Sequence, residues 1–361
     1  MQNPMNILIT APSLDTTKNV SGVATVVSTI INHNRHHKYY HYLLGSPDRR
    51  LSKPAWAFEL IRQILAFPFF LRKYKIDIVH QNLPFDPKGL TREFVINLWC
   101  RIMRVPVFLH VHGGVFLMKK TTNPVYLFFA NSIFKHSQKV VVLSGLERET
   151  IASLYDVKDA DVLYNSINTK ELKHERRQYD AVNPKILFLG RIHESKGIED
   201  IYDAFRKLDA TINFTFILCG TGPLKDTLVC QFDELLGNRF QFKGIVSGKE
   251  KNDIIKSVDF FLLPSRYGEG LPMALLESMA AGVVPIVTDD ASMKFIVKDK
   301  VNGIRVDKYN PEDIAEQLTF IFNNPQLYTD LSENAATLIQ KDYDIDSYIT
   351  KINLLYSQVK K

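Results

Sequence analysis

The sequence predicts an α/β protein with two doubly wound, Rossmann-like halves that face each other across a cleft. Its 361 residues are about twice the size of a typical single domain. Short runs of β-branched or aliphatic residues alternate with longer amphipathic stretches, a pattern typical of parallel strands covered by helices. The alternation lapses once, in a polar stretch that begins near residue 165, and then restarts. We therefore place a domain border there.

The first predicted domain covers residues 1–170 and contains five buried parallel strands. Helical patterns lie between them, as at 22–31, 54–74 and 92–103. The expected strands are 6–10 (NILIT), 76–80 (IDIVH), 105–111 (VPVFLHV), 139–143 (KVVVL) and 161–164 (DVLY).

The second predicted domain covers residues 185–345 and follows a linker at 171–184. We expect the last helix, at 346–361, to pack back towards the first domain, because its apolar residues recur at helical spacing. The expected strands of this domain are 185–189 (KILFL), 214–219 (FTFILC), 240–242, 259–263 (DFFLL) and 284–287 (VPIV).

The composition excludes several classes of protein. Hydrophobic residues make up 45% and charged residues 23%, which argues against a disordered or fibrous chain. Cys100, Cys219 and Cys230 have no metal-like spacing, so we expect buried free thiols in a reducing compartment. The start of the sequence lacks the pattern of a signal peptide, and no run of 18 apolar residues occurs. These features predict a cytoplasmic protein.

Positive charge is concentrated in the first half of the chain. The formal net charge is +6, but residues 1–183 carry 24 basic and 14 acidic residues, whereas the rest carries 21 and 25. The imbalance favours an anionic acceptor or surface near the first domain, although a chance excess on solvated faces explains it too. Nucleic acid is not the expected partner, since no basic motif interleaved with aromatic residues is present.

Three glycine-containing turns follow expected strands, where ligands of open α/β sheets bind. Gly22 stands at the start of an expected helix, where it serves either a phosphate or an ordinary helix entry. Arg191 and Lys196 in GRIHESKG suit a diphosphate, unless nearby glutamates (Glu194 or Glu199) neutralise them. The third turn, GTGP at 220–223, lacks the last glycine of a dinucleotide fingerprint, which disfavours nicotinamide and flavin cofactors.

The segment 264–287, PSRYGEGLPMALLESMAAGVVPIV, carries the most information. Pro272 suits the first turn of a helix, and Gly282 suits the position just past its end. The start of such a helix favours phosphate, while Glu269 and Glu277 are able to accept hydrogen bonds from sugar and ribose hydroxyls. The alternative is a loop carboxylate and a solvated helix glutamate.

At these residues the sequence resembles glycosyltransferase family 4, whose members have the GT-B fold and transfer sugars from nucleotide sugars with retention. EGLPMALLE matches the family's E-x7-E motif, GRIHESKG looks like GR-x4-KG, and GTGP looks like its G-x-GP turn. FKGIVSG resembles the segment that meets the nucleobase. The resemblance is strong over 185–290 and weaker over 1–180.

The resemblance implies a role for each matching residue. His112, in FLHVHGG, aligns with a strand-end histidine beside the reacting sugar, whereas we interpret His110 as structural, on the opposite strand face or deeper. The loop before Gly22 departs from the family pattern, with Ser21 in place of a glycine. The implied sets are catalytic His112 and Glu269; diphosphate-binding Arg191, Lys196, Gly22, Gly270 and Leu271; sugar-binding Glu269, Gly270 and His112; and ribose- or base-binding Glu277, Val246 and Gly222.

The expected reaction is retaining transfer of a sugar from a UDP- or GDP-sugar, without a cofactor. No D-x-D acidic pair follows a strand, so we expect no metal. The resemblance favours same-face attack, but the sequence does not separate it from a double displacement through Glu269. The alternatives are a nucleotide-sugar hydrolase or epimerase of the same fold, or a non-catalytic binding subunit.

The expected acceptor is a glycan or a polyprenyl-diphosphate-linked sugar in bacterial capsule, O-antigen or exopolysaccharide assembly. Aromatic runs at 67–70 and 126–129 lie near basic pairs, Arg72–Lys73 and Lys119–Lys120. If exposed, these runs suit peripheral docking on an anionic membrane; if buried, they belong to core helices.

Overall fold

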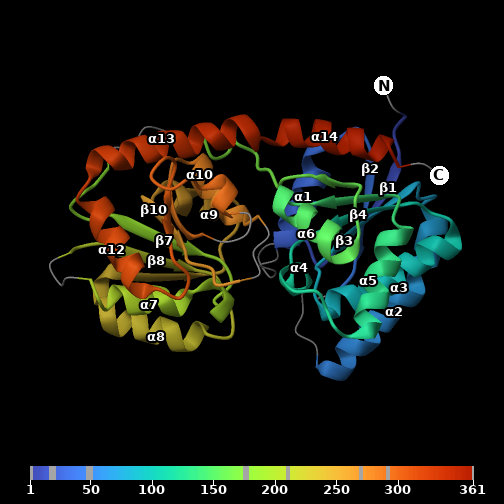
Figure 1. The fold of residues 1–361 in the computed structure, drawn as a ribbon, viewed down its shortest axis with the longest axis horizontal. Coiled ribbons are helices and arrows are strands. Elements are labelled where there is room, and N and C mark those ends of the chain that lie inside the picture. The colour runs from blue at the N-terminus through green and yellow to red at the C-terminus, as the bar shows by residue number, and fades with distance from the viewer. Residues whose placement is uncertain are drawn as a thin grey trace. The chain divides into compact units, whose positions relative to one another are not determined.

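The computed structural model describes residues 3–15, 22–45, 52–173, 179–208, 212–267, 271–289 and 293–359. The chain divides into two compact units. The first combines Met1–Asn165 with Ile345–Lys361, and the second comprises Ser166–Asp344. Figure 1 shows a sheet covered by helices in each unit. The border lies five residues before the predicted one, and the last helix belongs to the first unit.

The first unit contains a parallel sheet in the order β2-β1-β3-β4-β5-β6. Its strands are β1 (Asn6–Ala11), β2 (Lys38–Leu43), β3 (Ile78–Leu83), β4 (Val107–Val111), β5 (Lys139–Val142) and β6 (Ala160–Val162). Its helices are α1 (Gly22–His33), α2 (Lys53–Lys73), α3 (Pro87–Met103), α4 (Val115–Met118), α5 (Pro124–His136), α6 (Gly145–Tyr155) and α14 (Ile345–Ser357).

The second unit contains a parallel sheet in the order β12-β11-β10-β7-β8-β9. Its strands are β7 (Lys185–Leu189), β8 (Thr215–Cys219), β9 (Phe240–Gly244), β10 (Phe260–Leu263), β11 (Val284–Thr288) and β12 (Ile304–Val306). Its helices are α7 (Ile198–Phe205), α8 (Lys225–Leu236), α9 (Gly248–Lys256), α10 (Met273–Ala280), α11 (Met293–Ile296), α12 (Pro311–Phe322) and α13 (Pro325–Asp342), with short 3-10 turns η1 (Glu194–Lys196) and η2 (Gly237–Arg239). The two sheets confirm the predicted doubly wound α/β class.

The sequence did not predict β2 and β12, the strands at one edge of each sheet. β2 reads KYYHYL and buries only one of its six residues, so it lacks the continuous apolar run of a central strand. β12 has only three residues. The prediction for Cys230 was also wrong. Its thiol lies on the exposed side of α8, whereas Cys100 and Cys219 are buried as expected.

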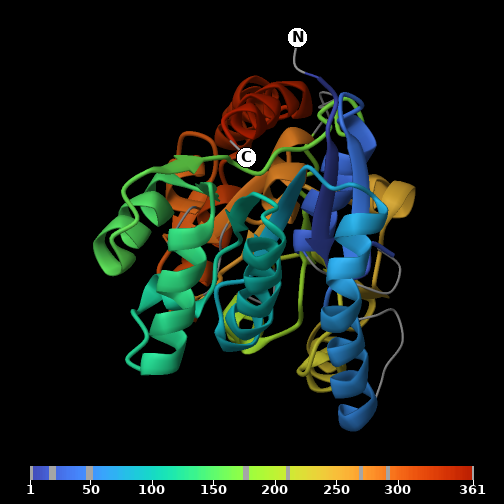
Figure 2. The same ribbon diagram turned by 90° about the vertical axis from the view of Figure 1, so that its right-hand side faces the viewer.

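α2, α3 and α5 form a layer of neighbouring helices in the first unit, with α3 in the middle (Figure 2). Rings from α3 and α5 meet inside it, where Phe94 and Phe129 stack with centroids 4.2 Å apart. Phe67 of α2 is fully buried and meets Tyr42 of β2. The inner side of the layer therefore closes the apolar core.

Backbone packs directly on backbone at the carboxyl ends of β7, β8 and β10. A Cβ atom at Gly220, whose φ is +135°, would lie 1.8 Å from the Gly190 carbonyl oxygen. At Gly222 it would lie 2.0 Å from the Ile192 oxygen, and at Gly197 2.0 Å from the Pro264 oxygen. These glycines are required because no side chain fits between the loops.

We expect Gly220→Ala to destabilise the second unit by about 3 kcal/mol or more, because it adds a backbone clash to an unfavourable φ. Gly237→Ala is the matched control. Gly237 also has positive φ (+55°), but a Cβ there would meet nothing within 4 Å, so it should lose only the cost of its backbone conformation, about 1–3 kcal/mol, and less than Gly220→Ala. Urea unfolding followed by circular dichroism measures both. Equal losses would show that the close approach to Gly190 is unimportant.

Candidate active site

Arg191 and Lys196 lie in the loop that follows β7 in the second unit. The acids that the sequence offered as their partners are engaged elsewhere. The Tyr267 hydroxyl donates to Glu194 at 2.7 Å, and Glu199 pairs with Arg266 at 2.9 Å. Arg191 is exposed, and no carboxylate of the described residues forms a salt bridge with it. Its guanidinium is thus available to an anionic ligand.

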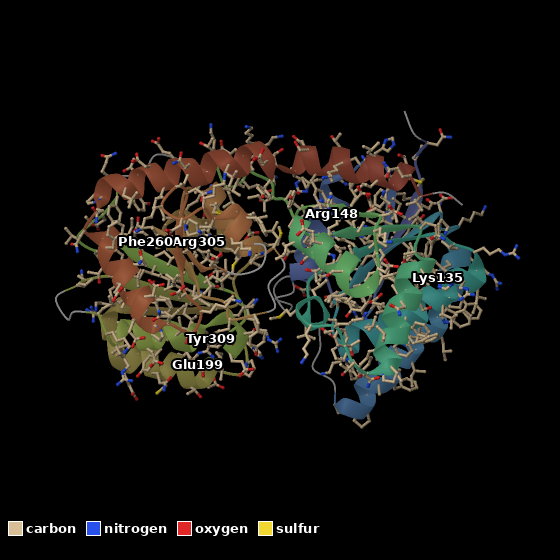
Figure 3. All side chains as sticks on the ribbon, viewed as in Figure 1. Lys135, Arg148, Glu199, Phe260, Arg305 and Tyr309 are labelled. Atoms are coloured by element: carbon tan, nitrogen blue, oxygen red, sulfur yellow. The ribbon has the colours of Figure 1, made fainter. Side chains whose placement is uncertain are left out.

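Arg266 joins the loop after β10 to the loop after β7. Its guanidinium binds Asp200 through two hydrogen bonds of 2.6 and 2.9 Å, and it lies 5.1 Å from the centre of the Tyr309 ring. Its backbone N–H donates to the Ser195 carbonyl at 2.9 Å. Figure 3 labels Glu199, the second acid of this cluster, and Tyr309. No sequence motif pointed to Arg266, although it stands three residues before Glu269 in the segment 264–287.

The structure bears out the helix predicted in this segment. α10 begins directly after Pro272, and Gly282 has a φ of +77° just past its end. Leu271 is buried. The predictions for Glu269 and Gly270 fall on residues 268–270, which lie outside the described residues.

Glu277 on α10 is a buried carboxylate that forms an ion pair. Lys251 of α9 donates to Glu277 Oε1 at 2.6 Å, and Glu277 is only 7% exposed. The alternative of a solvated helix glutamate is therefore wrong. The bond from Lys251 uses Oε1, so Oε2 is able to accept from a ligand hydroxyl.

The remaining residues that the sequence predicts to bind the donor nucleotide are Val246, Gly222 and Gly22. Val246 is buried in the turn between β9 and α9. Gly222 packs on Ile192, so its lack of a side chain already has a structural reason. Gly22 begins α1 as predicted, and a Cβ atom there would meet nothing within 4 Å. No contact within the described part of the chain requires glycine at that position.

Histidines from β3 and β4 line up inside the first unit. His80 Nε2 lies 3.3 Å from His110 Nδ1, and the rings of His110 and His112 are 4.1 Å apart. The interpretation that placed His110 on the opposite strand face is wrong, because residues i and i+2 of a strand share a face. His110 lies deeper than His112 on that same face, which is the other reading that the sequence left open. At the inner end, His80 Nδ1 lies 2.7 Å from the Tyr356 hydroxyl of α14.

Burial keeps these rings neutral. It lowers the pKa of His112 to about 3 and holds the pKa values of His80 and His110 well below the ordinary value, with a smaller contribution from neighbouring histidines. Near pH 7, His112 is therefore a neutral hydrogen-bonding group at the carboxyl end of β4. A cationic role for His112 has no support in this environment.

Two family models match the chain in succession. The model described as "Glycosyltransferase Family 4" matches residues 20–171, and "Glycosyl transferases group 1" matches residues 169–338. The chain belongs to glycosyltransferase family 4. This membership makes it a glycosyltransferase and confirms the resemblance inferred from the E-x7-E motif.

Relatives of this glycosyltransferase span most of its length. An uncharacterized glycosyltransferase of Methanocaldococcus jannaschii is 28% identical over 323 residues, covering 83% of this chain and 80% of the relative. An Escherichia coli relative, 23% identical over 82% of this chain and 79% of its own, is named UDP-Gal:alpha-D-GlcNAc-diphosphoundecaprenol alpha-1,3-galactosyltransferase.

Solved structures share the same architecture. Anabaena HepE, crystallised with UDP and glucose, superposes with a TM-score of 0.78 at 16% identity, over 98% of this chain and 99% of HepE. At this identity the likeness shows the fold alone, which is GT-B.

The glycosyltransferase should lose stability as the pH falls below about 6.5. Unfolded histidines take up protons there, whereas His80, His110 and His112 and the similarly buried His37 (pKa about 4) stay neutral while folded. The free energy of unfolding thus contains the full contribution of these rings above pH 6.5. Below that pH it falls by roughly 1.4 kcal/mol per pH unit for each such ring.

Fluorescence measures this loss, because both tryptophans, Trp56 and Trp99, lie in the first unit. Urea unfolding at pH 7.5, 6.5 and 5.5 should give decreasing free energies of unfolding. His110→Phe cannot take up a proton and should show a shallower pH dependence. Equal free energies at pH 7.5 and 5.5 in the unmodified protein would contradict the assignment of neutral buried rings.

Proposed function

We propose that this glycosyltransferase moves a sugar from a UDP- or GDP-sugar to a glycan or lipid-linked acceptor, with retention of anomeric configuration. The observation that carries the proposal is the loop after β7. It offers the exposed guanidinium of Arg191, with which no carboxylate of the described residues forms a salt bridge, and Lys196 lies in the same loop. A site for a diphosphate needs positive charge that its own protein does not neutralise.

The donor diphosphate accumulates negative charge as the sugar–phosphate bond breaks. Arg191 and Lys196 stabilise that charge, with the backbone N–H groups of Gly22, Gly270 and Leu271 as further donors. Since these groups supply the stabilisation, we propose that no metal is required. His112 and Glu269 contact the transferred sugar.

The nucleoside binds beside Glu277, whose free oxygen accepts from a ribose hydroxyl, with Val246 and Gly222 near the base. Attack by the acceptor on the same face as the departing phosphate agrees with the expected absence of a covalent nucleophile. Trapping a glycosyl intermediate on Glu269 would instead favour double displacement.

A polyprenyl-diphosphate-linked sugar is the acceptor that we propose, in the assembly of a bacterial surface polysaccharide. The E. coli relative is named for transfer to a diphosphoundecaprenol-linked sugar. The basic first half of the chain suits the diphosphate of such an acceptor.

A donor screen tests the function. Thermal shift across nucleotide sugars identifies the donor, because binding raises apparent stability, and a transfer assay with that donor follows. Release of free sugar without acceptor would indicate a hydrolase. An epimerised donor would indicate an epimerase, and binding without turnover would indicate a non-catalytic subunit.

Arg191→Ala and Lys196→Ala should each raise the transition-state free energy by at least ~2.7 kcal/mol, about a hundredfold in kcat/KM, the scale of a lost oxyanion donor. Arg206→Ala is the matched control, because Arg206 is an exposed arginine of the same unit that pairs with Asp203. Near-normal turnover of both site variants on an authentic donor would remove this loop from the mechanism.

The outer side of α2 is proposed to dock on an anionic membrane. Phe58, Ile61, Leu65 and Phe69 are 56–72% exposed, and at 3.6 residues per turn they lie within an arc of about 80°. The aromatic run at 67–70 is thus divided, with Phe67 in the core and Phe69 on the surface. None of the described helices is long and apolar enough to cross a membrane, so contact would be peripheral.

The charges around this stripe suit anionic lipid. Together α2, α3 and α5 contain eight lysines and arginines, among them Lys135 (Figure 3), and only two acids. Glu59 is paired with Arg62 at 2.6 Å, and Glu93 is buried. Phe128 of α5, from the second aromatic run, adds an apolar side chain that is 61% exposed.

Co-sedimentation with phosphatidylglycerol-containing vesicles should show binding that high salt weakens. The double variant Phe58→Ser/Phe69→Ser should lower vesicle affinity about a hundredfold or more, since each phenylalanine buried in the membrane contributes about 1.5–3 kcal/mol. Phe295→Ser, which replaces a 56% exposed phenylalanine of the second unit, should change nothing. Absence of salt-sensitive binding, or an equal loss in the Phe295 variant, ends the membrane proposal.

A further inference from the structure

Asn82 is a buried amide at the carboxyl end of β3 that contacts His112. It is 2% exposed and lies opposite His110 in the register of β3 and β4. Its Oδ1 lies 2.6 Å from His112 Nε2. Neither the motifs nor the family resemblance singled out this residue.

Thr10 of β1 fixes which way the Asn82 amide points. Asn82 Nδ2 donates to the Thr10 carbonyl oxygen at 2.7 Å, and the Asn82 backbone N–H donates to the Thr10 hydroxyl at 3.1 Å. A carbonyl oxygen only accepts hydrogen bonds, so the NH₂ group must face Thr10. Oδ1 then faces His112, and because Oδ1 also only accepts, the proton must be on His112 Nε2.

The second ring nitrogen of His112 is left with a lone pair. In a neutral imidazole one nitrogen donates and the other accepts, so Nδ1 is the acceptor. No described residue forms a hydrogen bond with Nδ1. Whereas Asn82 and His110 are at most 2% exposed, His112 is only partly buried, so the ring lies at the border of the core.

Packing against His110 holds the His112 ring in place. His110 packs against His112 with a ring separation of 4.1 Å. His80 contacts His110, and Tyr356 contacts His80. Rotation of the His112 ring would break its bond to Asn82 and disturb this packing. Both the tautomer and the orientation of His112 are thus set by neighbours within the first unit.

We propose that Asn82 is a positioning residue that holds His112 as the Nε2–H tautomer, so that Nδ1 accepts a hydrogen bond from a substrate hydroxyl. The last step rests on the proposed function, in which His112 contacts the transferred sugar. Asn82 itself touches no substrate. It acts through His112, as hydrogen-bond partners of functional histidines commonly do.

Nuclear magnetic resonance reads the tautomer without any substrate. In protein labelled with ¹⁵N-histidine, two-bond ¹H–¹⁵N spectra distinguish Nε2–H from Nδ1–H rings, and His112→Gln identifies the His112 signals among the ten histidines. We expect His112 to be Nε2–H near pH 7. An Nδ1–H ring in the unmodified protein would overturn the proposal, and this measurement needs no Asn82 variant to fold.

Asn82→Ala tests the consequence for catalysis. We expect mixed tautomers and a fall in kcat of about tenfold or more, the effect of one lost hydrogen bond at a reacting group, while KM for the donor changes less than about twofold. Asn97→Ala is the control, because Asn97 is a buried asparagine of the same unit that bonds Gln81 and Ser137. It should lower stability and leave the His112 tautomer and kcat unchanged.

The outcomes separate this proposal from the proposed function. Equal kcat losses in the two asparagine variants would reduce Asn82 to a structural role. A protein with the Nε2–H tautomer that binds no nucleotide sugar would keep the positioning role of Asn82 and reject the donor assignment. If transfer is observed but His112 is Nδ1–H, the function stands and the positioning role fails.

Discussion

Direct contact of backbone on backbone at three glycines is the constraint on which the second unit depends. Gly197, Gly220 and Gly222 bring the loops after β7, β8 and β10 closer together than any side chain allows. The Arg266 guanidinium then joins the loop after β10 to the first turn of α7 through Asp200 and Glu199. The loop after β7 is consequently held in a rigid frame whose salt bridges do not use Arg191, and the charge of that guanidinium is left for a ligand.

The first unit is also built on a parallel sheet, but it meets a different requirement. A central strand of a parallel sheet is covered on both faces, yet β3 contains His80, Gln81 and Asn82 at positions that are all buried. Such groups need hydrogen-bond partners inside the protein. Tyr356 supplies one for His80, Glu93 supplies one for Gln81, and Thr10 supplies one for Asn82. Satisfying these groups also fixes the ring at the end of β4.

Sequence reasoning was sound where one local pattern determines the outcome. The apolar runs predicted the central strands, and Pro272 and Gly282 predicted both ends of α10, because each acts through its own backbone. Local patterns say little about partners that are distant in sequence. The Arg266 cluster, the Lys251–Glu277 pair and the Thr10–Asn82–His112 relay all join residues that are 26 or more positions apart. The edge strands β2 and β12 were not predicted, because β2 buries only one of its six residues and β12 is short, so neither has a continuous run of apolar residues.

The assignment of α14 to the first unit affects how the protein is made. Residues 1–165 leave the ribosome first, but their unit stays incomplete until 345–357 follow, because Ile352, Leu355 and Tyr356 are buried in it. The second unit is continuous in sequence, so it is able to fold before α14 has been synthesised. For the duration of about 180 further residues of synthesis, the first unit exposes the surface that α14 will cover. Its early neighbours in the cell, including chaperones, therefore meet an apolar surface that the finished enzyme does not present.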